Sequence, residues 1–193
     1  MFRRVAAALV LAVTGAAVLA LSTRDGQAPS AAAPAPVAAP ASVAAPSGAD
    51  VHYAQMMADH HGQAVRMSRA LLAKPGVPER IRLIADFIAH DQQREIDETN
   101  AWLAAWNAPP ARAAGAMPGM LSEAQLGSLD RAGTGEATGL FLRLMIDHHE
   151  GAIDMSRTLL AGGGTNVYIH GLAKHVINEQ TAEIDSMRSL LAA

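Results

Sequence analysis

The sequence predicts an all-α protein: a ferritin-like four-helix bundle made of two duplicated helical hairpins with a long connection between them. Three observations lead to this fold class. A segment of 17 residues occurs twice, each copy lies in a stretch with helical periodicity, and no stretch alternates apolar and polar residues as a strand would.

The internal repeat is the clearest feature of the chain. Residues 57–73 match residues 145–161 at eleven of 17 positions, and both copies contain Asp-His-His. The offset of 88 residues continues without a gap, since Gln92 and Glu95 recur as Gln180 and Glu183. A gap-free offset of this length indicates a duplicated unit, with copies at about 50–106 and 136–191.

Helix-breaking residues divide each unit into a hairpin. The first helix is expected over about 50–73 and ends at Lys74-Pro75-Gly76, and the second starts near Pro78 and reaches about residue 106. The third spans about 136–161, before three glycines, and the last runs from a cap at Thr165 or Asn166 to about residue 191.

The connection between the units spans about 107–135. Its prolines predict a loop, and Ser122 to Gln125 form a capping box that predicts a short helix. A connection of this length can run along a bundle, which permits the ferritin-like topology with antiparallel first and third helices. The two His-His pairs would meet at similar height whether those helices are parallel or antiparallel.

The N-terminal quarter is expected to lie outside the fold. Residues 1–26 combine a short basic start with an uncharged apolar run, which predicts a cleaved signal peptide or an uncleaved N-terminal membrane anchor. Residues 27–49 contain eleven alanines and five prolines without a charge, which is typical of a semi-extended linker. The folded domain is therefore expected over 50–193, in a secreted, periplasmic or cell-surface protein.

Composition excludes several classes of function. The chain has no cysteine, so disulfides, thiolate metal sites and cysteine nucleophiles are ruled out. Its net charge is −3, and residues 50–193 carry −5, so nucleic acid is not an expected partner. Eight histidines and nine methionines stand out against this background.

The repeated histidines fall on the apolar stripe of each long first helix. His60 and His148 hold core positions, while His61 and His149 flank the same stripe. The stripes themselves are Tyr53, Met57, His60, Ala64, Met67, Leu71 and Phe141, Met145, His148, Ala152, Met155, Leu159. The remaining histidines, His52, His90, His170 and His175, lack a repeat and are expected at the surface.

The second helix of each hairpin adds polar groups to an otherwise apolar face. Gln92 and Glu95, like Gln180 and Glu183, lie among core positions, where a polar side chain must find a partner. Ligands from four helices could converge on one interior point. The candidate metal ligands are His60, His61, His148, His149, Met57, Met67, Met145, Met155, Glu95 and Glu183.

Ligand chemistry ranks the metals. Imidazole suits copper, zinc and iron, and thioether favours copper, especially the reduced ion, so copper ranks first with iron and zinc as alternatives. A di-iron bundle normally supplies Glu-x-x-His, which is absent, and no catalytic motif is recognised. Unperturbed histidines would lose metal below about pH 6.5. A polar structural network remains the alternative interpretation of the same residues.

Two segments resemble a known family. Gly119-Met120-Leu121, followed by Phe141-Leu-Arg-Leu-Met-Ile-Asp-His-His-Glu-Gly-Ala-Ile-Asp-Met155, is similar to the domain of unknown function 305 family, and residues 56–64 repeat the motif. The resemblance covers about 50–191 and implies a secreted or membrane-tethered bacterial bundle, some of whose members bind copper. Members often carry Phe-Asp where Ala137-Thr138 stands, whereas Asp50 fills that place in the first unit. If this aspartate binds metal, the two units have unequal sites.

These observations together predict an extracytoplasmic metal-binding protein, most simply a copper buffer or carrier, with no enzymatic activity indicated and no protein partner identified. Two alternatives from other classes stay open. One is a ferritin-like metal oxidoreductase that uses Glu95 and Glu183 as ligands. The other is an interaction module in which the His pairs are structural.

Overall fold

The computed structural model describes residues 44–110 and 117–192, and the expected leader at 1–26 and most of the expected linker lie outside these ranges. The described residues form five helices and no strand, as an all-α bundle requires. The helices are α1 (Gly48–Leu72), α2 (Glu79–Ala105), α3 (Glu123–Arg131), α4 (Thr134–Gly162) and α5 (Val167–Leu191). The ends of the four long helices lie within two residues of the positions expected from the sequence.

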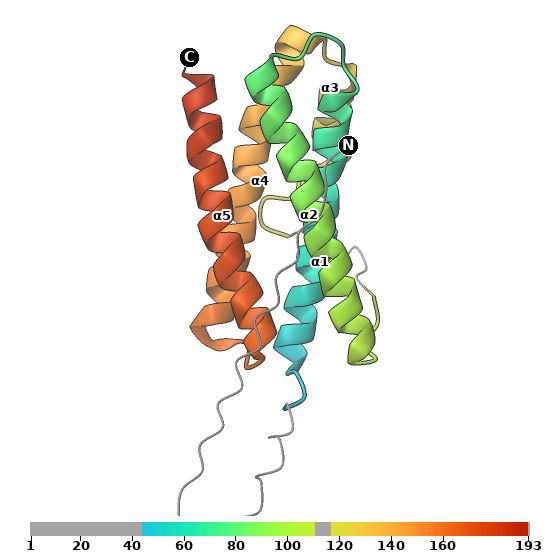
Figure 1. The fold of residues 1–193 in the computed structure, drawn as a ribbon, viewed down its shortest axis with the longest axis vertical. Helices are drawn as coiled ribbons and strands as arrows, with labels where there is room; N and C mark the ends of the chain where they lie inside the picture. Colours follow the sequence, from blue (N-terminus) through green and yellow to red (C-terminus); the bar gives the residue numbers. More distant parts are fainter. Residues whose placement is uncertain (1–43, 111–116, 193) are drawn as a thin grey trace, which may run out of the picture. The chain divides into compact units, whose positions relative to one another are not determined.

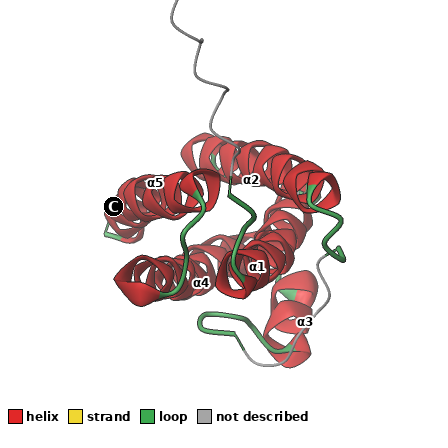
Figure 2. Cartoon of the chain, turned by 90° about the horizontal axis from the view of Figure 1, so that it is seen from below, coloured by secondary structure: helices red, strands yellow, loops and turns green. Residues whose placement is uncertain are grey.

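Two hairpins, α1–α2 and α4–α5, lie side by side, with α1 packed against α4 (Figures 1 and 2). The start of α1 contacts the later part of α4, and the end of α1 lies near the start of α4. Tyr53 Oη and Ser156 Oγ are 2.7 Å apart, while Thr134 Oγ1, at the start of α4, donates to the carbonyl of Pro75, just after α1, at 2.8 Å. The first and third long helices are therefore antiparallel. The short helix α3 packs on the outside of α1 and α4 (Figure 2).

The start of α1 is fixed by a capping box, and the helix begins two residues earlier than expected. The Ser47 hydroxyl accepts from the backbone N–H of Asp50, whose carboxylate in turn accepts from the backbone N–H of Ser47. The same carboxylate accepts the backbone N–H groups of Thr165 and Asn166, at 3.1 to 3.2 Å, in the loop between α4 and α5. Burial alone would raise the pKa of Asp50, but these hydrogen bonds outweigh it and lower the pKa.

The core consists of two hydrophobic clusters at different heights along the bundle. One contains Met67, Leu71, Phe141 and Met145, and the other contains Tyr53, Met57, Met155 and Leu159. Along α1 and α4 the motif histidines lie between these sets. The bundle therefore places a polar layer in the middle of its apolar core. Within the described ranges, no helix has both the length and the apolar character needed to cross a bilayer.

Candidate metal centre

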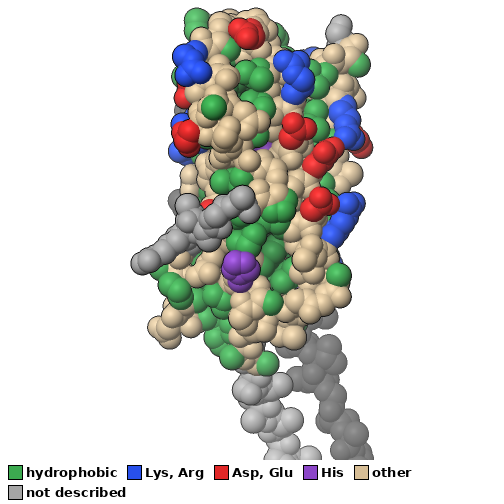
Figure 3. Space-filling view, turned by 180° about the vertical axis from the view of Figure 1, so that it is seen from behind, with side chains coloured by type: hydrophobic (Ala, Val, Ile, Leu, Met, Phe, Trp, Pro, Cys, Tyr) green, Lys and Arg blue, Asp and Glu red, His purple; other side chains and the backbone are tan. Residues whose placement is uncertain are grey.

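Four histidines form the polar layer between the two apolar clusters. His60, His61, His148 and His149 are each at most 1% exposed. The rings of His60 and His148 face each other across the α1–α4 contact, with centroids 3.7 Å apart and planes tilted by 34°. Histidine covers little of the molecular face in Figure 3, in keeping with this burial. The apolar stripe thus places the repeated histidines in the interior, as predicted.

Two of these histidines pair with the repeated glutamates. His61 Nε2 lies 2.7 Å from Glu95 Oε2, and His149 Nε2 lies 2.6 Å from Glu183 Oε2. The hydrogen bond from His61 helps to keep the pKa of Glu95 low, against the opposing effect of burial. A carboxylate can only accept, so each Nε2 carries a hydrogen, and in the neutral ring Nδ1 then keeps its lone pair. Both Nδ1 atoms are buried without a hydrogen-bond partner.

The two stacked histidines also present unused nitrogens. His60 Nε2 donates to the backbone carbonyl of Pro118 at 3.0 Å, which leaves its buried Nδ1 without a partner. Neither ring nitrogen of His148 has a hydrogen-bond partner. Buried polar atoms without partners are uncommon in folded proteins and call for an explanation, such as a bound ion. All four imidazoles therefore have a nitrogen available for a further interaction.

Burial keeps the stacked pair uncharged. Loss of solvent, reinforced by the neighbouring histidines, lowers the pKa of His60 to about 3 and that of His148 well below its usual range. A neutral imidazole is the form that coordinates metal. The sequence expectation that metal binding weakens below about pH 6.5 therefore does not apply to these two rings, which stay neutral in more acidic solution.

The predicted thioethers occupy the same bundle region in two separate pairs. Met57 and Met155 share one apolar cluster, and Met67 and Met145 share the other. Each of the four is at most 7% exposed. Because α1 and α4 are antiparallel, Met57, which precedes the His pair of α1, lies near Met155, which follows the His pair of α4. In the same way, Met67 lies near Met145. The pairs thus lie on the two sides of the histidine layer.

The sequence allowed ligands from four helices to converge on one interior point, and the structure does not bring the four motif histidines into such a group. Among the described His, Asp and Glu residues, only Asp91, Glu95, His175 and Glu179 form a group of three or more whose ligand atoms all lie within 4.8 Å of one another. Glu95 and Glu183, expected as ligands, instead accept hydrogen bonds from histidines, which suits an orienting role. Asp50, which the resemblance suggested as a ligand, is used in helix capping.

Of these four residues, the sequence analysis identified only Glu95 as a candidate ligand and missed the other three. His175 was expected to be an ordinary surface histidine, because Phe87 occupies its position in the first unit. Its side chain is 47% exposed, yet Nε2 lies 3.0 Å from Glu95 and 2.6 Å from Glu179. Asp91 and Glu179 are equivalent at the offset of 88, so a carboxylate repeated at this position was the signal that could have identified them.

A short loop segment from Met117 to Leu121 contains the Pro118 carbonyl that accepts from His60. Gln63 on α1 binds both backbone polar groups of Leu121, accepting at 2.7 Å and donating at 3.0 Å. On the other side, Gly119 adopts φ +74° and packs its backbone directly on α4. A Cβ on Gly151 would lie 2.2 Å from the Pro118 carbonyl oxygen, so only glycine permits this approach.

We expect Gly151→Ala to push this loop away from α4, because the added methyl overlaps backbone that cannot rotate aside. Overpacking of this kind costs about 1–3 kcal/mol in the free energy of unfolding. The matched control is Gly62→Ala on α1, where a Cβ meets nothing within 4 Å. That change should stabilise by about 0.5–1 kcal/mol through helix propensity. Urea unfolding of both variants checks the pair, and equal effects would contradict the role of Gly151.

The fold and the buried histidine layer define a class of helical-bundle proteins with repeated Asp-His-His motifs. The chain belongs to the DUF305 family, a domain of unknown function, which it matches over residues 50–191. This confirms the resemblance seen in the sequence. No curated protein matches the chain at a significant level.

Two solved structures of DUF305 proteins and one of CopM are similar to this fold. A DUF305 fragment from Deinococcus radiodurans is 29% identical with a TM-score of 0.70, covering 76% of this chain and 97% of its own. A DUF305 protein from Streptomyces coelicolor, inferred to be secreted, is 30% identical with a TM-score of 0.70, covering 75% and 92%. CopM in its Cu(I)-bound form is 31% identical with a TM-score of 0.59, covering 73% and 94%.

Proposed function

We propose that this chain binds copper outside the cytoplasm and serves as a copper buffer or carrier. The observation that carries the proposal is the set of four buried imidazoles, each with a nitrogen that has no hydrogen-bond partner. Such groups are costly in an apolar core unless a further partner compensates them. A metal ion that accepts the free lone pairs would supply this compensation.

The donor set fits copper best. Imidazole nitrogens bind both oxidation states of copper, and thioethers select the reduced ion. The ligands in this proposal are His60, His61, His148 and His149 together with Met57, Met67, Met145 and Met155. Structures of CopM exist with Cu(I), with Cu(II) and with silver, a soft ion like Cu(I), which supports the same choice here. Zinc and iron remain the alternatives.

Glu95 and Glu183 act in this proposal as positioning residues. Each accepts the Nε2–H of a histidine, which fixes the ring, and the Nδ1 of that ring is buried without a hydrogen-bond partner. Carboxylates behind metal-binding histidines have this role in many metal sites. The oxidoreductase alternative would require these carboxylates at the metal, so their pairing with histidines favours binding and transfer.

The location outside the cytoplasm rests on the N-terminal sequence. A basic start, an apolar run and an Ala/Pro-rich linker are the pattern of an exported or anchored domain. The Streptomyces coelicolor relative, inferred to be secreted, is consistent with export. In such a location a carrier would meet copper before the ion reaches the cell interior.

We expect residues 44–193 alone to bind copper saturably, because every proposed ligand lies in that span. Calorimetric titration with Cu(II), and with Cu(I) under anaerobic conditions, measures this directly. Metal analysis after exposure to copper, zinc and iron together tests the choice of ion. A fragment that folds but takes up no copper would refute the proposed function, and preferential loading with zinc or iron would refute its metal assignment.

Replacing Met145 and Met155 by leucine should weaken Cu(I) binding and leave Cu(II) binding nearly unchanged. The swap conserves volume, so it should cost less than about 1.5 kcal/mol of stability at each position. Competition titrations with a Cu(I) chelator give the affinity. The matched control is Met187→Leu, a buried methionine that shares a cluster with Met145 but has no counterpart in the repeat. Unchanged Cu(I) affinity in the double variant would mean that the methionines are only core residues.

A further inference from the structure

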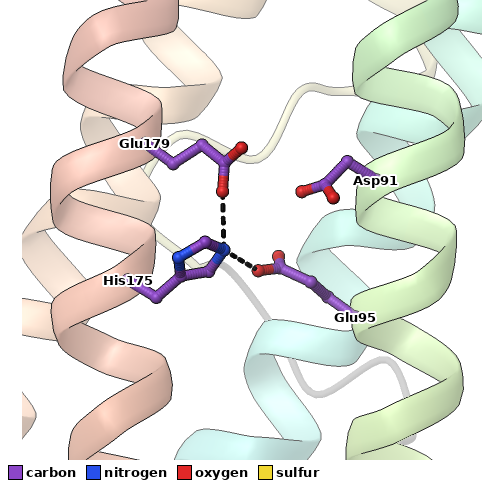
Figure 4. A group of neighbouring side chains, drawn as sticks. All are labelled: Asp91, Glu95, His175 and Glu179. Carbon is purple, nitrogen blue, oxygen red and sulfur yellow. Dashed lines mark ion pairs between the residues drawn. The ribbon is translucent and has the colours of Figure 1, made fainter.

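A second group of metal-ligating side chains lies between α2 and α5, on the outer side of the histidine layer. Figure 4 shows Asp91 and Glu95 on α2 facing His175 and Glu179 on α5. The ligand atoms of these four residues all lie within 4.8 Å of one another. His175 Nε2 contacts both Glu95 Oε1 at 3.0 Å and Glu179 Oε2 at 2.6 Å. Three carboxylates and one imidazole thus converge from two helices.

A small cavity adjoins this group and carries unsatisfied polar atoms. Its volume is about 10 Å³, the room of one water molecule or small ion, and its lining includes Asp91, Glu95 and Glu179. Gln92 and Gln180 also line it, and each is only 3% exposed. Both side-chain polar atoms of Gln92 and the Oε1 of Gln180 lack hydrogen-bond partners. A polar ligand in this cavity would satisfy these buried amides.

The charges around the cavity favour a cation as that ligand. Four carboxylates line the cavity, those of Asp91, Glu95, Glu179 and Glu183. Arg94 contacts Asp91 and Glu98 from the solvent side. Of the four carboxylates at the cavity, Arg94 contacts only Asp91, so a divalent ion between α2 and α5 would relieve the repulsion among them.

The internal repeat relates this group to a second position, formed by Phe87, Asp91, Glu179 and Glu183, and only the first position includes a histidine. At the offset of 88, Glu95 corresponds to Glu183, but His175 corresponds to Phe87. Phe87 is 50% exposed and cannot bind metal. An exact repeat would place the same residue type at 87 and 175. Because the two differ, only one of the two related positions has an imidazole.

We propose that Asp91, Glu95, His175 and Glu179 form a binding site for a divalent cation that prefers oxygen ligands, of the Mn²⁺ class. Carboxylate oxygens suit such ions, and one imidazole is compatible with them, whereas soft Cu(I) prefers thioether. The site is distinct from the buried histidine layer and does not depend on the copper function proposed above. Glu95 joins the two, because its other oxygen accepts from His61.

The test is a Mn²⁺ titration of the full chain. Binding is measured by the decrease in the electron paramagnetic resonance signal of the free hydrated ion. We expect one saturable site in the wild type. His175→Phe introduces the residue type that the other unit carries, and Glu179→Gln conserves shape, so both should keep the fold. Each should weaken Mn²⁺ binding by about tenfold or more, since removal of a ligand or its orienting partner has this effect.

Two further variants serve as controls. His90→Ala removes an exposed histidine beside Asp91 that is outside the group, and it should bind Mn²⁺ as the wild type does. His148→Ala with His149→Ala should lose copper and keep Mn²⁺, which separates this site from the proposed function. The inference is overturned if the wild type shows no saturable Mn²⁺ binding. It is equally overturned if folded His175→Phe and Glu179→Gln both bind with wild-type affinity.

Discussion

Replacement of His148 and His149 by alanine is expected to remove most Cu(II) binding. His148 is the one motif histidine with neither ring nitrogen hydrogen-bonded. In His149, Glu183 holds the ring through Nε2, and Nδ1 has no hydrogen-bond partner. Loss of both takes away every imidazole that α4 contributes to the layer. We expect the apparent Cu(II) affinity to fall roughly a hundredfold or more, given the effect of single changes around metal sites.

The control for this experiment is His52→Ala with His170→Ala. Neither residue belongs to the repeat, and His52 is exposed, while His170 contacts the backbone carbonyl of Gly164. Circular dichroism and calorimetric titration of both double variants, with each oxidation state of copper, separate folding from binding. Equal copper loss in the control and the motif variant would show that the site assignment is wrong.

The metal-free bundle is expected to lose stability as the pH falls below about 6.5. In the unfolded chain histidine titrates near pH 6.5, whereas in the folded bundle the pKa of His60 is about 3. Between these values the unfolded state binds a proton that the folded state does not, so acid favours unfolding. Relative to neutral pH, His60 alone then lowers the free energy of unfolding by on the order of 2 kcal/mol at pH 5, and His148 lowers it further.

Urea unfolding of the metal-free protein at pH 7.5, 6.5 and 5.0 measures this loss. Asp50 does not account for it, because its lowered pKa preserves its stabilising contribution until the pH falls below its unfolded value of about 3.8. His60→Leu should flatten the pH dependence, while His90→Ala, which removes an exposed ring, should leave it unchanged. Equal stability of the wild type at pH 7.5 and 5.0 would contradict the neutral burial of the stacked pair.

The arrangement of helices was predictable because local sequence sets it. Pro75 and Gly76 follow the end of α1, the glycines after Ala161 end α4, and the Ser122 capping box starts α3 as expected. The start of α1 was misplaced by two residues because the linker composition concealed the Ser47 cap. The antiparallel pairing of α1 and α4 could not be chosen from the sequence, because both directions bring the His pairs to the same height.

The candidate site was only partly predictable. Helical periodicity is enough to place His60 and His148 in the core, since the stripe around them is apolar. Periodicity cannot tell which acceptor a ring nitrogen meets, so the contact of His60 with the Pro118 carbonyl was not foreseen. The same limit applies to His175, whose importance depends on a neighbouring helix that is distant in sequence.

The capping carboxylate of Asp50 also determines how the bundle responds to a mechanical load. Tension passed along the chain from the residues before Ser47 arrives at the first turn of α1. That turn is bonded through Asp50 to the backbone of Thr165 and Asn166, so the load is shared with the α4–α5 loop. Unwinding the first turn would therefore also release the hydrogen bonds from Asp50 to this loop, so we expect this end of the domain to resist extension.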